Sequence, residues 1–190
     1  ANLAANYNGF LDAMVDNTII TEEEATKRKL NYVTGANRIL LTDETLTDLS
    51  PYMAGPAAAL LPFARARHST SADIVPLSTG SVLGTLKDDN PQTVWGVSYP
   101  VEDRHVLIPT ESAAIVQRIA DFNAAIKAIA DANPTRLAYA DVHKTIQGFV
   151  TSNPPLYIIN GVALTPNINP PTGIYSEDGL HPNSRGYALL

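Results

Sequence analysis

The residues of this chain best placed to do chemistry are Asp178 and His181, which lie three positions apart near the C-terminal end. A carboxylate can accept a hydrogen bond from one imidazole nitrogen, which fixes the tautomer and leaves the other nitrogen free to take a proton. Gly179 permits a sharp turn between them, and Pro182 suits the first position of a helix that we expect over 182–190. The pair therefore predicts a general base held in orientation by an acid. The same spacing also suits an acid and a histidine that merely cap a surface turn.

The longer string around this pair, YSEDGLHPNSRGYALL, resembles the last motif block of the SGNH (GDSL-type) ester hydrolases. Two further runs, TSADIVPLSTGSVLGTL and NPQTVWGVSYPVEDRHVLIPTESAAIVQRIADFNAAIKAIADAN, are similar to a Bacteroidetes-like subgroup of that superfamily. The resemblance extends from Thr21 to the C-terminal end. It implies that His181 is the base that activates a serine and that Asp178 orients this base. It also implies an exported protein, periplasmic or associated with an outer membrane as a lipoprotein.

The nucleophile and oxyanion blocks of that family are missing, because the sequence contains neither Gly-Asp-Ser nor G-x-N-D. We therefore expect residues 1–190 to be the C-terminal part of one SGNH-like domain, with the serine in the remaining N-terminal part of the same protein. The predicted function is ester hydrolysis by a Ser-His-Asp triad, with a small ester, a lipid or an acylated sugar as substrate. The alternative is a catalytically inactive binding or assembly subunit of an outer-membrane complex, since a fold does not guarantee activity.

Composition narrows the classes of function. Hydrophobic residues make up 45% and charged residues 17% of the 190 residues, which is ordinary for a globular domain with one sizeable core. A net charge of −6, with no basic cluster longer than KRK at 27–29, argues against nucleic acid as a partner. The absence of cysteine excludes disulfides, thiolate metal sites and a cysteine nucleophile. The four histidines are scattered and no H-E-x-x-H or calcium loop is present, so we expect no metal and no cofactor.

Two other acid–histidine pairs, Asp103/His105 and Asp141/His143, are rival candidates for a dyad. Asp141 stands where an expected strand gives way to a helix, so we expect it to cap that helix and His143 to face water. His105 follows a charged turn and is expected at the surface. Ser81, in the run STGS, lacks the flanking glycines of a nucleophile elbow and is expected in a loop or at a cap.

The fold class follows from the second half of the chain. Apolar residues recur at spacings of four and three in a helix expected from 109 to about 133, and they predict one buried stripe: Ile115, Ile119, Phe122, Ile126 and Ile129. A buried strand is expected over 137–141 and a helix over 142–147. Helix, strand, helix in this order indicates an α/β layer with a parallel sheet. The resemblance implies that this layer is part of a three-layer SGNH-hydrolase-like core.

Shorter patterns predict the other elements. Helices are expected over 2–15, over 21–30 behind a T-E-E-E capping box, and around 56–65. We expect a strand pair over 31–42, extended runs over 94–101 and 105–108, and a hairpin over 157–164 that turns at Asn160-Gly161. In the run 94–101, Trp95, Val97 and Tyr99 would alternate onto one face. Residues 42–93 are irregular but apolar, so we expect an inserted cap segment packed over the site.

Overall fold

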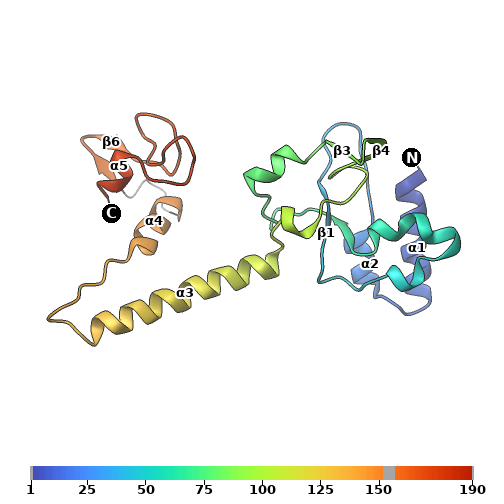
Figure 1. Ribbon diagram of the computed structural model, residues 1–190, viewed down its shortest axis with the longest axis horizontal. Helices are drawn as coiled ribbons and strands as arrows, with labels where there is room; N and C mark the ends of the chain where they lie inside the picture. Colours follow the sequence, from blue (N-terminus) through green and yellow to red (C-terminus); the bar gives the residue numbers. More distant parts are fainter. Residues whose placement is uncertain (1, 152–156, 190) are drawn as a thin grey trace. The chain divides into compact units, whose positions relative to one another are not determined.

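The computed structural model describes residues 2–151 and 157–189 of the chain. The chain divides into two compact units, Ala1–Gln117 and Arg118–Leu190. Within the described residues the strands form three small sheets of two antiparallel strands each (Figure 1). The expected three-layer α/β core with a parallel sheet is therefore wrong for this chain.

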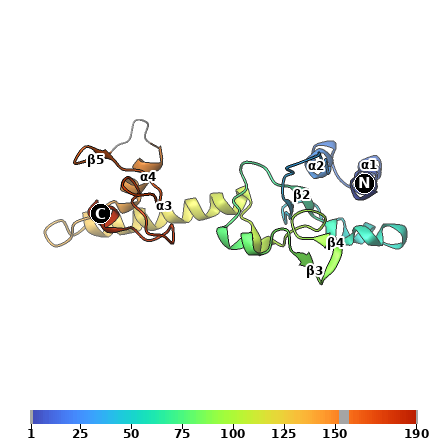
Figure 2. The ribbon, with the colours of Figure 1, turned by 90° about the horizontal axis from the view of Figure 1, so that it is seen from above.

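The core of the first unit lies between two helices and a long 3-10 segment. Helix α1 (Asn2–Asp16) and helix α2 (Glu22–Arg28) lie side by side in both views (Figures 1 and 2), and η2 (Gly55–Phe63) packs against α1. Tyr7 is fully buried there, and its hydroxyl donates to the carbonyl oxygens of Phe63 and Ala66. The Thr21 hydroxyl accepts from the Glu24 amide, so α2 begins with the expected cap. Both predicted N-terminal helices are confirmed.

The expected strand pair over 31–42 is wrong. Strand β1 (Leu40–Thr42) pairs instead with β2 (Ala66–His68), and residues 31–38 form no strand. The side chain of Asn37 gives the physical reason. Its Oδ1 accepts from the Val33 amide and its Nδ2 donates to the carbonyl oxygens of Val33 and Gly35, so it takes backbone groups that a strand ladder would need.

The segment 42–93 is irregular, as expected, but it is built into the first unit. It contains η1 (Ser50–Tyr52), η2, β2, η3 (Leu77–Ser81), β3 (Leu86–Lys87) and most of β4 (Asn90–Val94). The helix expected around 56–65 is present as the 3-10 segment η2, with Pro62 inside it. The Leu49, Met53 and Phe63 side chains are buried in the core against α1 and α2. The apolar content of the segment is therefore explained by packing.

The prediction of extended runs over 94–101 and 105–108 is also wrong. Strand β4 ends at Val94, whose carbonyl oxygen accepts from three amides, those of Val97, Ser98 and Tyr99. This turn brings the rings of Trp95 and Tyr99 edge to face, 5.0 Å apart, in place of an alternating strand. Further along, η4 (Asp103–His105) precedes a single antiparallel bridge between Leu107 and Ile74.

Helix α3 (Pro109–Asp131) is present as expected and crosses the boundary between the units. The predicted burial of its stripe is wrong, because the five side chains are 39–61% exposed: Ile115, Ile119, Phe122, Ile126 and Ile129. The strand expected over 137–141 is not formed either, and Leu137 is 47% exposed. Without a strand at 137–141, nothing in the described part of the second unit supplies the sheet that would cover this helix face.

The remainder of the second unit is made of short elements. Helix α4 (Val142–Thr151) confirms the helix expected over 142–147, although it is longer. The hairpin of β5 (Ile158–Ile159) and β6 (Val162–Ala163) turns as predicted at Asn160 and Gly161, both with positive φ. A short helix, α5 (Ser184–Tyr187), ends the described chain. None of the helices in the described residues is long and apolar enough to cross a membrane.

Candidate functional site

The structure brings Asp178 and His181 together in the second unit. Oδ2 of Asp178 lies 2.6 Å from Nδ1 of His181. Oδ1 of the same carboxylate accepts hydrogen bonds from the backbone amides of Leu180 and His181, at 2.9 and 3.0 Å. One oxygen therefore fixes the loop and the other fixes the imidazole ring.

A short neck of paired backbone holds the loop that carries these two residues. The Ser176 amide donates to the His181 carbonyl oxygen, and the Asn183 amide donates to that of Ile174, both at 2.8 Å. Inside the loop, the Gly179 amide donates to the Ser176 carbonyl oxygen, and Gly179 has φ +69°. Glycine adopts this left-handed conformation without steric cost, so it suits the sharp turn predicted between Asp178 and His181.

Asn183 anchors the neck, and sequence reasoning missed this role. Its Oδ1 accepts from the amides of Arg185 and Gly186, and its Nδ2 donates to the carbonyl oxygens of Gly173 and Tyr175. The helix expected to begin at Pro182 begins instead at Ser184, with Asn183 as its cap. Asparagine is a preferred N-cap residue, which was the available signal.

The electrostatics of the pair favour an ionised acid. Backbone hydrogen bonding from Leu180, followed by the hydrogen bond with His181, lowers the pKa of Asp178 to about 2. Asp178 is therefore a carboxylate at neutral pH and Nδ1 of His181 carries the proton that it accepts. Within residues 2–151 and 157–189, no group pairs with Nε2 of His181, and 68% of this side chain is exposed. That nitrogen is available to take a proton from a ligand or nucleophile.

The rival acid–histidine pairs are not dyads in this structure. Oδ1 of Asp141 accepts from the Lys144 amide and caps α4, while His143 is exposed, as predicted. No ion pair in the described part of the chain joins Asp103 to His105. His105 was expected at the surface but is half-buried. The Ser81 hydroxyl donates to the Ser78 carbonyl oxygen at the end of η3, which fits a loop residue.

Three carboxylates from distant parts of the first unit meet at one place, and no local pattern in the sequence predicts this meeting. Ligand atoms of Glu44, Asp103 and Glu111 all lie within 4.8 Å of one another. A hydrogen bond with Asp103, aided by burial and by like charge, raises the pKa of Glu44 to about 7. Oδ and Oε atoms are the ligands that Mg²⁺ and Ca²⁺ prefer. Glu44 and Asp103 are exposed, however, and Glu111 already accepts from the Ile108 amide at the start of α3.

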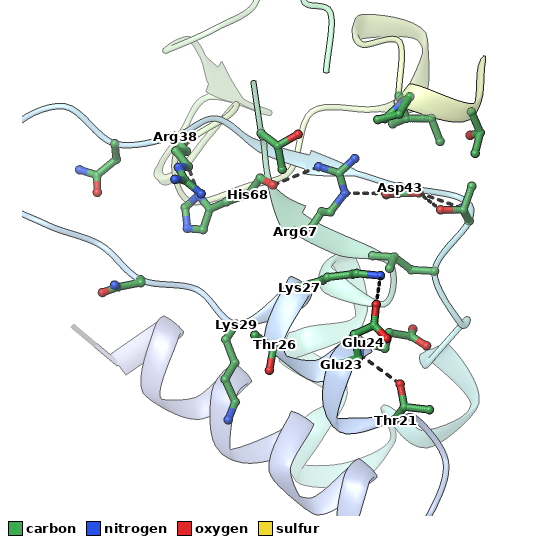
Figure 3. Close-up of a pocket in the computed structure, with 18 of the residues that line it drawn as sticks. Thr21, Glu23, Glu24, Thr26, Lys27, Lys29, Arg38, Asp43, Arg67 and His68 are labelled. Atoms are coloured by element: carbon green, nitrogen blue, oxygen red, sulfur yellow. Dashed lines mark hydrogen bonds and ion pairs between the residues drawn. The ribbon is translucent and has the colours of Figure 1, made fainter. Parts of the chain in front are cut away.

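The first unit also contains a cavity of about 870 Å³ (Figure 3). Its walls come from α2, from residues 31–38, from the chain around β1 and β2, and from the start of α3. Charged side chains in the walls are mostly paired: Lys27 with Glu23, and Arg67 with Asp43. Separate segments assemble the cavity, so no local pattern in the sequence predicted it.

Comparison with protein families, with curated proteins and with solved structures found no match to this chain. A functional interpretation therefore depends on the geometry of the sites and on the string of residues around the dyad.

Proposed function

We propose that Asp178 and His181 are the acid and the base of a serine ester hydrolase. The observation that carries this proposal is the 2.6 Å contact between Oδ2 and Nδ1, in a loop whose other carboxylate oxygen accepts two backbone amides. Such a contact holds the imidazole in the tautomer in which Nε2 has a free lone pair. The resemblance of the surrounding string to SGNH hydrolases adds the chemical class.

The proposed reaction follows from this tautomer. Nε2 of His181 removes the proton of a serine hydroxyl as its oxygen attacks the ester carbonyl, and it later gives that proton to the leaving alcohol. Asp178 stabilises the imidazolium that exists between these two steps. As the resemblance implies, we assign the serine and the oxyanion donors to a part of the same protein outside residues 1–190.

Exposed apolar side chains in the loop of the dyad and on the helix that follows it bear on the substrate. Leu180, which lies between the two residues of the pair, is 73% exposed, and Tyr187 on α5 is 61% exposed. Exposed apolar groups next to a reactive centre favour an ester with an apolar group over an acylated sugar. Small or lipid esters are therefore the proposed substrates.

The test is His181→Ala in the full-length protein, assayed with p-nitrophenyl butyrate. General acid–base catalysis typically contributes about 100- to 10,000-fold, so we expect a loss of at least about 100-fold. The matched control is His143→Ala, which removes an exposed histidine of the same unit and should leave turnover unchanged.

A fluorophosphonate probe provides an independent measurement, because it modifies only an activated serine. Mass spectrometry should find one labelled serine in the wild type and none in His181→Ala. Unchanged hydrolysis by His181→Ala would contradict the proposal. A wild-type protein that neither hydrolyses esters nor takes up the probe would favour the binding or assembly subunit instead.

A further inference from the structure

Residues 31–38 form one wall of the 870 Å³ cavity, and this strap is attached to the first unit in an unusual way. Within the described residues, none of its backbone groups takes part in a backbone–backbone hydrogen bond. Both of its ends are fixed. The Leu30 amide donates to Oδ1 of Asn8 at 2.8 Å, and the Ile39 carbonyl oxygen accepts from the Ser69 amide at 2.7 Å. The strap is therefore a segment with firm ends and a lightly held middle.

Side chains alone hold the middle of the strap. The Tyr32 hydroxyl donates to the Val97 carbonyl oxygen at 2.7 Å, and Nδ1 of His68 lies 3.1 Å from the Arg38 carbonyl oxygen. The rings of Tyr32 and His68 meet edge to face, with centroids 5.1 Å apart. The hydrogen bonds of Asn37 to Val33 and Gly35 are internal to the strap, so they stiffen it without attaching it to anything.

His68 is the sensitive part of this attachment. The carbonyl oxygen of Arg38 can only accept a hydrogen bond, so Nδ1 of His68 must donate and Nε2 of the neutral ring carries a lone pair. Nε2 is buried, and none of the described residues pairs with it. A proton added to Nε2 would place an unpaired, charged donor in a buried position, which is costly.

The charged groups around the ring oppose protonation as well. Arg38 on the strap is a cation, and no ion pair between His68 and a carboxylate is found in the described part of the chain. The neighbouring Arg67 of β2 occupies both nearby carboxylates, Asp43 and Asp73. Two lysines that line the same cavity are also cations, and each is ion-paired to an acid of its own. Lys27 on α2 pairs with Glu23, and Lys29, which directly follows α2, pairs with Asp12.

We propose that His68 is a pH-sensitive latch whose protonation releases residues 31–38 and opens this wall of the cavity. Burial is the largest influence and lowers the pKa of His68 below its usual value of 6.5; the hydrogen bond to the Arg38 carbonyl oxygen opposes this shift, and the charge of Arg38 adds to it. The direction of the pH dependence follows from this lowered pKa. The contribution of His68 to holding the strap is fully present above pH 6.5, and it is lost as the pH falls from that value through the lower pKa of the latched ring, because the released ring binds the proton more tightly.

The experiment uses one introduced cysteine and the one tryptophan of the chain as a pair of probes. The sequence contains no cysteine and one tryptophan, so Ala36→Cys labelled with bimane places a single dye on the exposed strap. Ala36 itself lines the first cavity, but its neighbours Gly35 and Asn37 line a second cavity with Trp95, so the linker of a dye at position 36 can bring it to Trp95, which quenches bimane on contact. Quenching should be strong at pH 7.5 and should be lost on acidification, with a midpoint below pH 6.5.

Two variants and one measurement decide the outcome. His68→Asn keeps a neutral donor near the Arg38 carbonyl oxygen but cannot titrate, so its quenching should not change between pH 7.5 and 5. His143→Ala, which removes an exposed histidine, should behave as the wild type. A pH-independent signal in the wild type, or the same pH change in His68→Asn, would overturn the proposal. Circular dichroism that shows the whole unit unfolding at the same midpoint would overturn it too.

Discussion

The two units of this chain each contain an acidic side chain in close contact with a nitrogen donor, but in opposite surroundings. In the first unit, Arg67 lies 2.5 Å from Asp43 and makes two hydrogen bonds to Asp73, at 2.7 and 2.8 Å. These side chains are 7%, 7% and 0% exposed. In the second unit, Asp178 and His181 are 2.6 Å apart, yet their side chains are 50% and 68% exposed. The contacts are alike in length and differ in access to solvent.

This difference separates structural from chemical roles better than pKa does. All three acids have a lowered pKa. For Asp43 and Asp73, burial is the largest influence and acts to raise the pKa, but hydrogen bonds outweigh it, from Thr45 and Arg67 for Asp43 and from Arg67 and Thr70 for Asp73. For Asp178, hydrogen bonds dominate and burial is minor. Only the exposed pair can exchange a proton with a substrate, so we expect the buried cluster to govern stability and the exposed pair to govern turnover.

The largest expected effect is that of Asp178→Asn on ester hydrolysis. Asparagine keeps Oδ1 as the acceptor of the Leu180 and His181 amides, so the loop should retain its shape. Its Nδ2 would face Nδ1 of the ring and favour the wrong tautomer. In serine proteases the equivalent change lowers turnover by about 10,000-fold, and we expect a loss approaching that size.

Nitrogen-15 chemical shifts of the imidazole provide the structural check on this variant. In the wild type, Nδ1 of His181 should carry the proton above the histidine titration range. In Asp178→Asn the proton should move to Nε2. An unchanged tautomer together with lost activity would assign Asp178 another role. Unchanged activity would contradict the view that the exposed pair governs turnover.

The next largest effect is expected for Arg67→Met, measured by denaturant unfolding. This change leaves Asp43 and Asp73 buried without their cation, and breaking a buried pair typically costs about 3–5 kcal/mol. Trp95, the single tryptophan, lies in the first unit and reports its unfolding. The control is Arg65→Met, because Arg65 makes a 3.7 Å surface pair with Asp48 and such pairs contribute only about 0–1 kcal/mol.

Acid should reduce the difference in the free energy of unfolding between Arg67→Met and the wild type. The pKa of Asp43 and that of Asp73 are lowered from the usual 3.8, so their contribution is present above pH 3.8 and is lost as the pH falls through the lower values of the folded state. The variant has already lost this contribution. Between pH 7 and pH 3, the free energy of unfolding should therefore fall more for the wild type than for Arg67→Met. An equal fall in both proteins would show that the ion pairs of Arg67 with Asp43 and Asp73 do not stabilise the first unit.

Local patterns in the sequence predicted the features that depend only on residues close together in the chain. The caps and stripes of α1, α2 and α4 depend on neighbours within one or two turns, and the Asn160-Gly161 turn depends on two residues. The contact between Asp178 and His181 was predictable for the same reason, since three positions separate them. Asn183 was missed because its partners on the other strand of the neck, Gly173 and Tyr175, are set by tertiary pairing.

Non-local pairing decided the rest of the fold. An apolar run such as 137–141 is a buried strand only when other strands lie beside it, and the described residues provide none. The stripe of α3 is exposed for the same reason. Likewise, β1 pairs with β2 although a nearer partner was expected, and Arg67 meets Asp43 only because those strands are neighbours.

The smallest expected effect is that of Gly186→Ala, which tests whether the exposed dyad depends on a packed base. A Cβ at this position would collide with the Ile174 carbonyl oxygen and approach Cβ of Pro182 to 2.7 Å. Overpacking of this kind typically costs about 1–3 kcal/mol, and here it would push α5 away from the neck that holds the His181 loop. Hydrogen exchange over residues 173–189 should rise and turnover should fall together, while unfolding followed by Trp95 stays unchanged. Gly9→Ala is the control: Gly9 is an exposed position inside α1 with no atom within 4 Å of a new Cβ, so alanine should stabilise the first unit by about 0.5–1 kcal/mol.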